Sequence, residues 1–442
     1  MLTAFVRAFQ TPDLRKKMLI TLGLIALFRF GASLPTPGID EKNVAICSNF
    51  ATSSGSSTAG VLAIVNLLSG QALLHLSVFA LGIMPYITAS IILQLLTVVI
   101  PRLETLKQEG QAGQSKITQY TRYLTVGLAI LQSTGYVELA RSGTLFNGCG
   151  VAGDNPIIPN GSVFSIATMV ITMVAGTTVI MWMGELITDR GVGNGMSVLI
   201  FTTVISVIPG ELLLIYRDKG AFEAAVALVV VVAIVAFVVF MEQAQRRIPV
   251  QYAKRMVGRR MYGGTSTYIP MKVNQAGVIP VIFASSLLYI PTLAAELFGK
   301  STTSGGWVGW VDRYLEQSSS PLYMAFFFAL IIGFTYFYVS ITFNPTEVAD
   351  NMKKYGGFIP GIRPGRPTAE YLTYVLSRLT APGSAYLGVV ALFPLLALAS
   401  IGVANEFPFS GVSLLIMVGV GLDTVKQIES QLQQRNYEGF LR

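Results

Sequence analysis

Six soft apolar side chains stand in stretches that also hold glycine, proline, serine or threonine, where a plain membrane anchor would carry leucine and valine. They are Ile83, Ile87, Met196, Ile200, Ile282 and Ile416. The first four form two pairs, each spaced four residues apart, so each pair shares one face of a helix. Around a common axis such side chains would hold back water and ions by dewetting, without a charged filter. From spacing alone, ordinary packing in a helical core is the favoured alternative.

Residue types that carry covalent chemistry are scarce. His75 is the single histidine, which argues against a histidine-based metal site or catalytic triad. No predicted span has a carboxylate near its middle, where proton-coupled pumps usually place one. The GKST run at 299–302 lacks the upstream glycine of a phosphate-binding loop, and RGVGNG at 190–195 lacks a preceding strand. We therefore expect no enzyme, no metal and no cofactor.

The elements that must position the six side chains are membrane-spanning helices. Of the 442 residues, 52% are hydrophobic and 12% are charged, whereas a soluble domain has about 25% charged residues. With roughly 20 apolar residues needed for each span, we predict ten spans. They are residues 18–35, 77–100, 123–140, 163–187, 196–216, 222–241, 275–295, 321–342, 371–398 and 409–426.

Charge predicts the orientation of these spans. Most of the 31 Lys and Arg residues lie in the terminal segments and in the loops on the same side of the membrane as the termini. The positive-inside rule therefore predicts that both termini are cytoplasmic. The ten spans divide into two sets of five, residues 1–220 and 221–442, as in proteins built from inverted repeats. No sequence identity between these halves is evident.

Residues 60–75, GVLAIVNLLSGQALLH, are apolar but too short to span a membrane, as is typical of re-entrant or interfacial segments. A short helix folded back into a cavity and an amphipathic helix on the outer surface fit the spacing equally well. Cys47 and Cys149 both fall in loops assigned to the outer face, where a disulfide can form. Two free thiols are the alternative.

Two basic loops on the cytoplasmic side look structured. Residues 246–273 contain strand-like runs around a turn at Gly258, Arg259 and Arg260, which predicts a hairpin-like protrusion. Residues 344–372 contain the tip FIPGIRPGRP, whose proline and glycine residues stiffen the loop and project Arg363. The positive-inside rule explains most of this charge but not the rigid tip, so we expect an acidic partner to dock there.

Several long motifs resemble the SecY family of protein-conducting channels, and its actinobacterial members in particular. They are FALGIMPYITASIILQLL, GELITDRGVGNG, QRRIPVQYAKR, KVNQAGVIPVIFASS, FNPTEVADNMKKYGGFIPGIRPG and VGLDTVKQIESQL. They follow one another in the family's order over almost the whole chain. The resemblance implies an all-α polytopic membrane protein with ten transmembrane helices, in two pseudo-symmetric five-helix halves around a central pore, plus a short re-entrant plug helix.

The resemblance also implies roles for single residues. It makes the six apolar side chains named above a pore ring, with Met196 at a position where isoleucine is common in the family. It places the plug on residues 60–75, with Leu62, Ile64, Asn66, Leu67, Leu68 and Gly70. Thr88 and Ile290 would lie at a lateral gate formed by the second and third spans with the seventh and eighth. Arg259, Arg260 and Arg363 match positions that dock the SecA motor or the ribosome.

The activity implied is translocation of unfolded secretory polypeptides across the cytoplasmic membrane, with lateral release of membrane segments into the lipid. The partners implied are SecE, SecG, the SecA ATPase, the ribosome, preproteins with their signal sequences, and membrane lipids. A secondary transporter of a small solute is the first alternative, and it needs a polar site at mid-membrane, for which the sequence offers only groups such as Gln94 and Asn274. An intramembrane enzyme is the second, and it needs a dyad or metal ligands inside spans.

Overall fold

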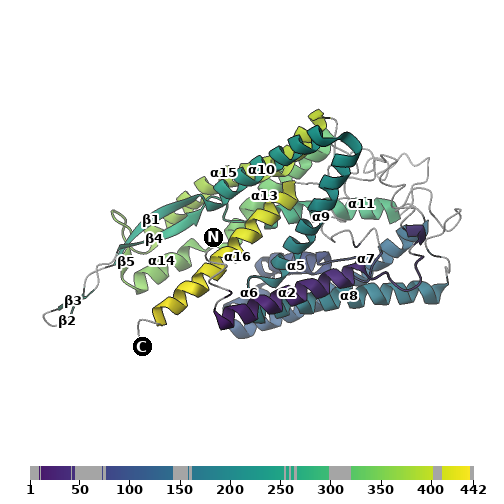
Figure 1. The fold of residues 1–442 in the computed structure, drawn as a ribbon. Helices are drawn as coiled ribbons and strands as arrows, with labels where there is room; N and C mark the ends of the chain where they lie inside the picture. The colour runs from purple at the N-terminus through teal and green to yellow at the C-terminus, as the bar shows by residue number, and fades with distance from the viewer. Residues whose placement is uncertain are drawn as a thin grey trace.

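Long helices run side by side and lead, at one end of the molecule, into a small sheet (Figure 1). The computed structural model describes residues 9, 11–40, 42–44, 72, 76–142, 158, 162–252, 255–257, 260–262, 266–297, 320–401 and 411–438. The segment predicted as a plug, apart from Ala72, and both cysteines lie outside these residues.

Among the described residues, ten long helices overlap the ten predicted spans. They are α2 (Pro12–Ser33), α5 (Met84–Val99), α7 (Gln111–Ser142), α8 (Val163–Arg190), α9 (Gly195–Lys219), α10 (Ala221–Gln243), α11 (Ile279–Leu297), α13 (Pro321–Thr342), α15 (Arg366–Ile401) and α16 (Gly411–Glu438). Among the described residues, five segments are by themselves long and apolar enough to cross a membrane: those containing α8, α10, α13, α15 and α16. The helical membrane architecture is confirmed, and the count of ten spans stays a prediction.

The beginning of the second predicted span is wrong. Residues 77–83 are not helical, and α5 begins only at Met84. Leu76 and Gly82 have positive φ values of 43° and 56°, which interrupt a right-handed helix. Pro85 then lies in the first turn of α5, where its missing N–H removes no helical hydrogen bond.

The region between the second and third spans is also more helical than predicted. α6 (Pro101–Gln108) follows α5 at an angle of 105°. Together the two helices are long and apolar enough to form one membrane span with a sharp bend. α7 then begins at Gln111, well before residue 123, where the third predicted span begins. The predicted loop 101–122 is thus mostly helix.

The basic loop after α10 forms the predicted hairpin. β1 (Gln245–Tyr252) pairs antiparallel with β4 (Ser266–Lys272), with Ile248 opposite Ile269. β2 (Arg255–Val257) and β3 (Arg260–Tyr262) form a second ladder, which projects beyond the rest of the molecule (Figure 1).

The second basic loop joins the same sheet. β5 (Gly357–Phe358) pairs with the other edge of β1, so the strand order is β4-β1-β5. α14 (Pro345–Lys354) and the first turns of α15 complete a common apolar core, which contains Ile248, Met352 and Leu372. We call this unit, formed by β1, β4, β5, α14 and the start of α15, the loop module. The sequence did not predict that its two loops share one sheet.

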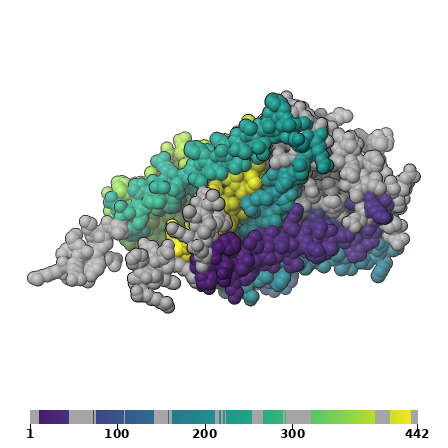
Figure 2. Space-filling view, viewed as in Figure 1, coloured from purple at the N-terminus to yellow at the C-terminus, as the bar shows by residue number. Residues whose placement is uncertain are grey.

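The main apolar core lies between the helices. It takes buried side chains from α2, α5, α7, α8, α9, α10, α11, α13, α15 and α16. α16 begins at its centre, because Leu414, Leu415 and Ile416 are each at most 1% exposed. In the space-filling view, purple α2 covers one side of the molecule, whereas only a strip of yellow α16 is visible beside the teal helices (Figure 2).

Candidate functional site

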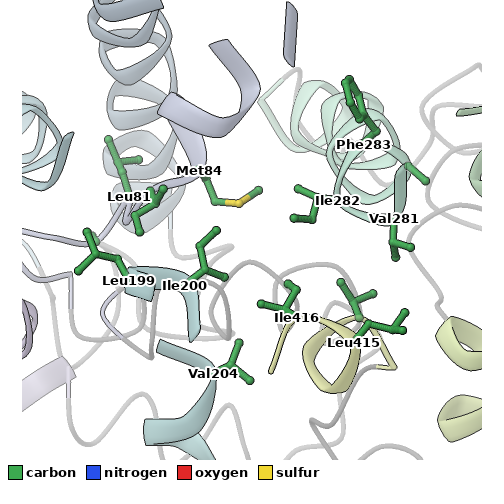
Figure 3. Close-up of a cluster of buried hydrophobic side chains, with 14 of the residues drawn as sticks. Leu81, Met84, Leu199, Ile200, Val204, Val281, Ile282, Phe283, Leu415 and Ile416 are labelled. Atoms are coloured by element: carbon green, nitrogen blue, oxygen red, sulfur yellow. The ribbon is translucent and has the colours of Figure 1, made fainter. Parts of the chain in front are cut away.

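The six side chains predicted to line a constriction belong to the main apolar core or pack against it. Four of them are buried: Ile83, Ile200, Ile282 and Ile416 are 2%, 6%, 7% and 1% exposed. Ile87 and Met196 are half-buried and pack against the same cluster. Figure 3 shows Ile200, Ile282 and Ile416 pointing from three helices toward a common centre. We call the six side chains the central ring.

Each member of the central ring stands near the beginning of its helix. Ile83 immediately precedes α5, and its carbonyl accepts the N–H of Ile87 at 3.1 Å. Met196 and Ile200 lie in the first two turns of α9, Ile282 lies in the first turn of α11, and Ile416 in the second turn of α16. Four helices far apart in the sequence therefore each bring one end to the same place.

The start of α9 is fixed by a cap that the sequence supplies locally. Asn194 accepts hydrogen bonds from the backbone N–H groups of Met196 and Ser197 at 3.1 and 3.4 Å. Asparagine is a favoured N-cap because its side chain satisfies such free donors. The motif GVGNG is thus the start of a helix, α9, that carries Met196 and Ile200. Its glycines and asparagine serve this helix start and give no sign of a phosphate-binding loop.

Met196 has room beside α8 because residue 184 is glycine. A Cβ atom added to Gly184 would overlap the Met196 sulfur and lie 2.7 Å from its terminal Cε. The thioether is flexible and apolar, so it fills this irregular space without adding a polar group to the cluster.

Met84 was missed by the sequence analysis. Its side chain is 8% exposed, and in Figure 3 it extends toward Ile282 and the same centre as the ring members. Helical spacing selected Ile83 and Ile87 but could not select Met84, because residue 83 precedes the helix and the backbone direction changes there.

The helices expected to form a lateral gate are in contact. α11 packs against both α5 and α7. Thr88 lies on α5, is half-buried, and donates its hydroxyl hydrogen bond to the carbonyl of Met84 at 2.9 Å. Ile290 lies in α11. The assignment of these two residues to the gate stays a prediction.

Among the predicted docking arginines, Arg363 is described in full and is exposed at the tip of the second loop. The tip is a series of turns: Ile362 N donates to Ile359 O at 3.0 Å, and the Thr368 hydroxyl donates to the carbonyl of Arg363 at 2.9 Å. Arg260 begins β3, and Arg259 lies outside the described residues. So do the predicted plug residues Leu62, Ile64, Asn66, Leu67, Leu68 and Gly70, and the cysteines Cys47 and Cys149.

Buried charge is rare in this protein. In the part of the chain that the structure describes, Glu242 is the one charged residue that is buried. It lies at the end of α10, beside the loop module, and accepts a hydrogen bond from Asn274. The same residues contain no group of three or more His, Cys, Asp or Glu side chains able to hold a metal ion. The six side chains themselves offer apolar contact and no hydrogen-bonding group.

Comparisons with known proteins identify the family of this chain. The SecY family model matches residues 77–425. Protein translocase subunits SecY of Streptomyces scabiei and Streptomyces coelicolor are 62% and 63% identical to this chain, and that of Mycobacterium tuberculosis is 58% identical, each over the full length of both chains. The predicted actinobacterial resemblance is confirmed.

Solved structures share the fold. A protein-conducting channel superposes with a TM-score of 0.63 at 18% identity, covering 94% of this chain and 92% of that one. Sec61 from the canine ribosome-channel complex of the endoplasmic reticulum gives 0.59 at 16% identity, with the same coverage of 94% and 92%. Because the family model matches most of the sequence and relatives align from end to end, this chain belongs to the SecY family.

Proposed function

We propose that this chain is the channel-forming subunit of a protein translocase and that its central ring seals the pathway at rest. Membership of the SecY family supports the first statement, and it makes the chain a multi-pass protein of the cell membrane. The observation that carries the second is that Ile200, Ile282 and Ile416 point toward a common centre, in the apolar core that Ile83, Ile87 and Met196 also contact.

The mechanism follows from the chemistry of these side chains. A narrow apolar constriction excludes water, so hydrated ions cannot cross it while it is closed. Isoleucine and methionine offer no hydrogen bonds, and they contact any polypeptide through dispersion and apolar contact alone. A yielding ring can therefore close around chains of varied sequence. The plug, which we assign to residues 60–75, would be displaced when a chain enters.

Lateral release needs a seam through which a signal sequence reaches lipid. We place it where α5 and α7 meet α11 and α13, with Thr88 and Ile290 beside it. The contact of α11 with α5 and α7 supports this assignment, since parting those helices would open the cluster sideways. The seam divides the chain into the halves 1–220 and 221–442.

Energy for transport must come from a partner. The family implies SecE and SecG as companion subunits, and SecA or a translating ribosome as the source of driving force. We assign docking to Arg259, Arg260 and Arg363, with both termini on that cytoplasmic side. The exposure of Arg363 on a stiff turn supports this assignment. We do not assign an enzymatic reaction to the chain itself.

No observation favours a small-solute transporter. Of the polar groups considered for such a binding site, Gln94 is exposed, and Asn274 is hydrogen-bonded to Glu242 and to the carbonyl of Gly277.

The proposal is tested at the ring. Ile83→Asn and Ile282→Asn, in the reconstituted complex, should raise resting ion conductance, because an amide lets water enter the constriction. Ile83→Val and Ile282→Val are the matched controls and should stay sealed. A stalled secretory chain should also crosslink to probes at residues 83 and 282. Unchanged conductance in both Asn variants, or crosslinks confined to peripheral helices, would reject the seal.

A further inference from the structure

The stretch before α5 is an irregular segment held inside the protein. Residues 76–83 run between α2 and α8 and end at Ile83 of the central ring. Non-helical backbone at membrane depth persists only where its polar groups are satisfied by protein or water. The contacts that hold this segment therefore also determine the position of Ile83 and the start of α5.

The residues that follow α2 satisfy part of its backbone. Val78 N donates to Leu34 O at 2.9 Å, and Thr36 N donates to Leu76 O at 3.1 Å. Pro35 and Ser77 form an antiparallel bridge between these two hydrogen bonds. The segment is thus paired with the chain that leaves α2, as in a short piece of sheet.

The side chain of Phe79 packs between α2 and α8. It is 7% exposed and stacks on Phe28 of α2, with ring centroids 5.9 Å apart and planes inclined by 16°. A Cβ atom added to Gly31, one turn further along α2, would overlap this ring and lie 2.6 Å from its Cζ atom. The ring therefore occupies the space that a side chain at residue 31 would need.

A second glycine receives the backbone next to Phe79. A Cβ atom on Gly176 of α8 would overlap the carbonyl oxygen of Val78 and lie 2.9 Å from its carbonyl carbon and 3.1 Å from Phe79 Cδ1. Here the obstacle is main chain, which cannot turn aside as a flexible side chain can. Two glycines on two helices thus form a slot from opposite sides of one phenylalanine.

We propose that Gly31 and Gly176 are positioning residues for the seal. They let α2 and α8 approach closely enough to lock Val78 and Phe79 in place, and the five residues from Phe79 to Ile83 then carry that position into the central ring. The inference rests on the proposed sealing role of Ile83. It adds that the seal depends on two residues that belong to neither the ring nor the plug.

The test compares glycines in equivalent helical settings. Gly31→Ala and Gly176→Ala should each raise resting ion conductance severalfold in the reconstituted complex. Gly23→Ala, on the same helix as Gly31, and Gly127→Ala, on α7, are the controls, because nothing lies within 4 Å of a Cβ atom at either position. Both controls should stay sealed. Equal conductance in Gly31→Ala and Gly23→Ala would overturn the proposal.

A second substitution separates the two contacts. Phe79→Leu removes the ring that Gly31→Ala would strike, so the double variant should leak less than Gly31→Ala. The same substitution should not rescue Gly176→Ala, whose main obstacle is the Val78 carbonyl. If Gly176→Ala fails to accumulate in the membrane, the Gly31 and Phe79 variants decide the question. Rescue of neither variant, or of both equally, would contradict the slot.

A distance measurement separates this inference from the sealing role itself. Spin labels on cysteines introduced at residues 83 and 416 should show a shifted or broadened distance distribution in Gly31→Ala, and none in Gly23→Ala. If the distance shifts in Gly31→Ala but Ile83→Asn does not leak, the slot is supported and the seal is rejected. If Ile83→Asn leaks but the distance does not shift in Gly31→Ala, the seal is supported and the slot is rejected.

Discussion

Asn274 donates a side-chain hydrogen bond to the carboxylate of Glu242, and both residues are buried, at 3% and 9% exposed. The bond joins the end of α10 to the segment that leads from β4 into α11. Asn274 also donates to the carbonyl of Gly277 at 3.2 Å, two residues before α11 begins. A single amide thus ties a strand, a helix end and the start of a ring-bearing helix together.

Asn274→Ala should lower thermal stability clearly, because it leaves Glu242 buried without this donor. Removing one partner of a buried hydrogen bond costs about 1–3 kcal/mol, and more when the other partner is charged. Glu242→Gln should be milder, since its carbonyl oxygen still accepts from Asn274. Thermal unfolding of the purified complex in detergent measures both effects.

The control for this prediction lies nearby on the surface. Lys272 Nζ is 3.4 Å from Asp423 Oδ1, and the two side chains are 43% and 64% exposed. Exposed ion pairs contribute about 0–1 kcal/mol, so Lys272→Ala should change the melting temperature little. An Asn274→Ala protein as stable as the Lys272→Ala protein would contradict the assigned role of the buried bond.

Arg122 and Glu185 form a two-pronged ion pair between α7 and α8. Arg122 Nε and Nη2 each donate to a different carboxylate oxygen of Glu185, both at 2.8 Å. The side chains are 49% and 22% exposed, so we expect a coupling energy below about 1 kcal/mol. Arg122→Lys should lose most of it, because an ammonium cannot make the paired contact. A double-mutant cycle with Glu185→Gln measures the coupling, and a value of several kcal/mol would refute this expectation.

Met196→Ile should preserve the resting seal. Swaps that conserve apolar volume usually cost less than about 1.5 kcal/mol, and the side chain stays apolar. Met196→Gln should leak, because it adds an amide to the ring while keeping a similar length. Conductance of the two variants, measured side by side, checks the pair. A leak in Met196→Ile would mean that the bend of the thioether beside Gly184 is required.

Arg363→Glu should reduce SecA-driven translocation severalfold without raising resting conductance, since it reverses a charge on an exposed tip far from the apolar cluster. Arg366→Glu is the matched control, because Arg366 is on the same tip but pairs with Glu370 at 3.2 Å. Translocation of a model preprotein into vesicles gives the rate, and a salt series tests the electrostatic origin. Equal losses in both variants would show that general charge matters rather than the position of Arg363.

The sequence by itself determined where most helices lie. The span predicted at 321–342 is α13, and the span predicted at 163–187 is α8 but for its last turn. These signals are local, because apolar length and composition decide whether a segment is a membrane helix. The hairpin between α10 and α11 was equally readable from strand-like runs around a basic turn. The family was readable too, from long collinear motifs.

Local signals failed where neighbours in space decide the backbone. The late start of α5 at Met84 depends on a segment paired with residues after α2 and packed on Gly176 of α8. Likewise, Gly357 and Phe358 became a strand only because β1 offers them a free edge. Neither stretch carries a strong propensity of its own, so contacts far along the chain determine its conformation.

Only the tertiary structure brought Ile200, Ile282 and Ile416 from three helices toward a common centre (Figure 3). Spacing could place Ile83 with Ile87, and Met196 with Ile200, on shared helix faces, but it favoured ordinary core packing for all six. The helices α5, α9, α11 and α16 each begin in the main apolar core, and Met84 points toward the same centre as Ile282. This arrangement depends on how the four helices pack. Packing is a property of surfaces that meet, and a one-dimensional pattern specifies each surface without specifying its partner.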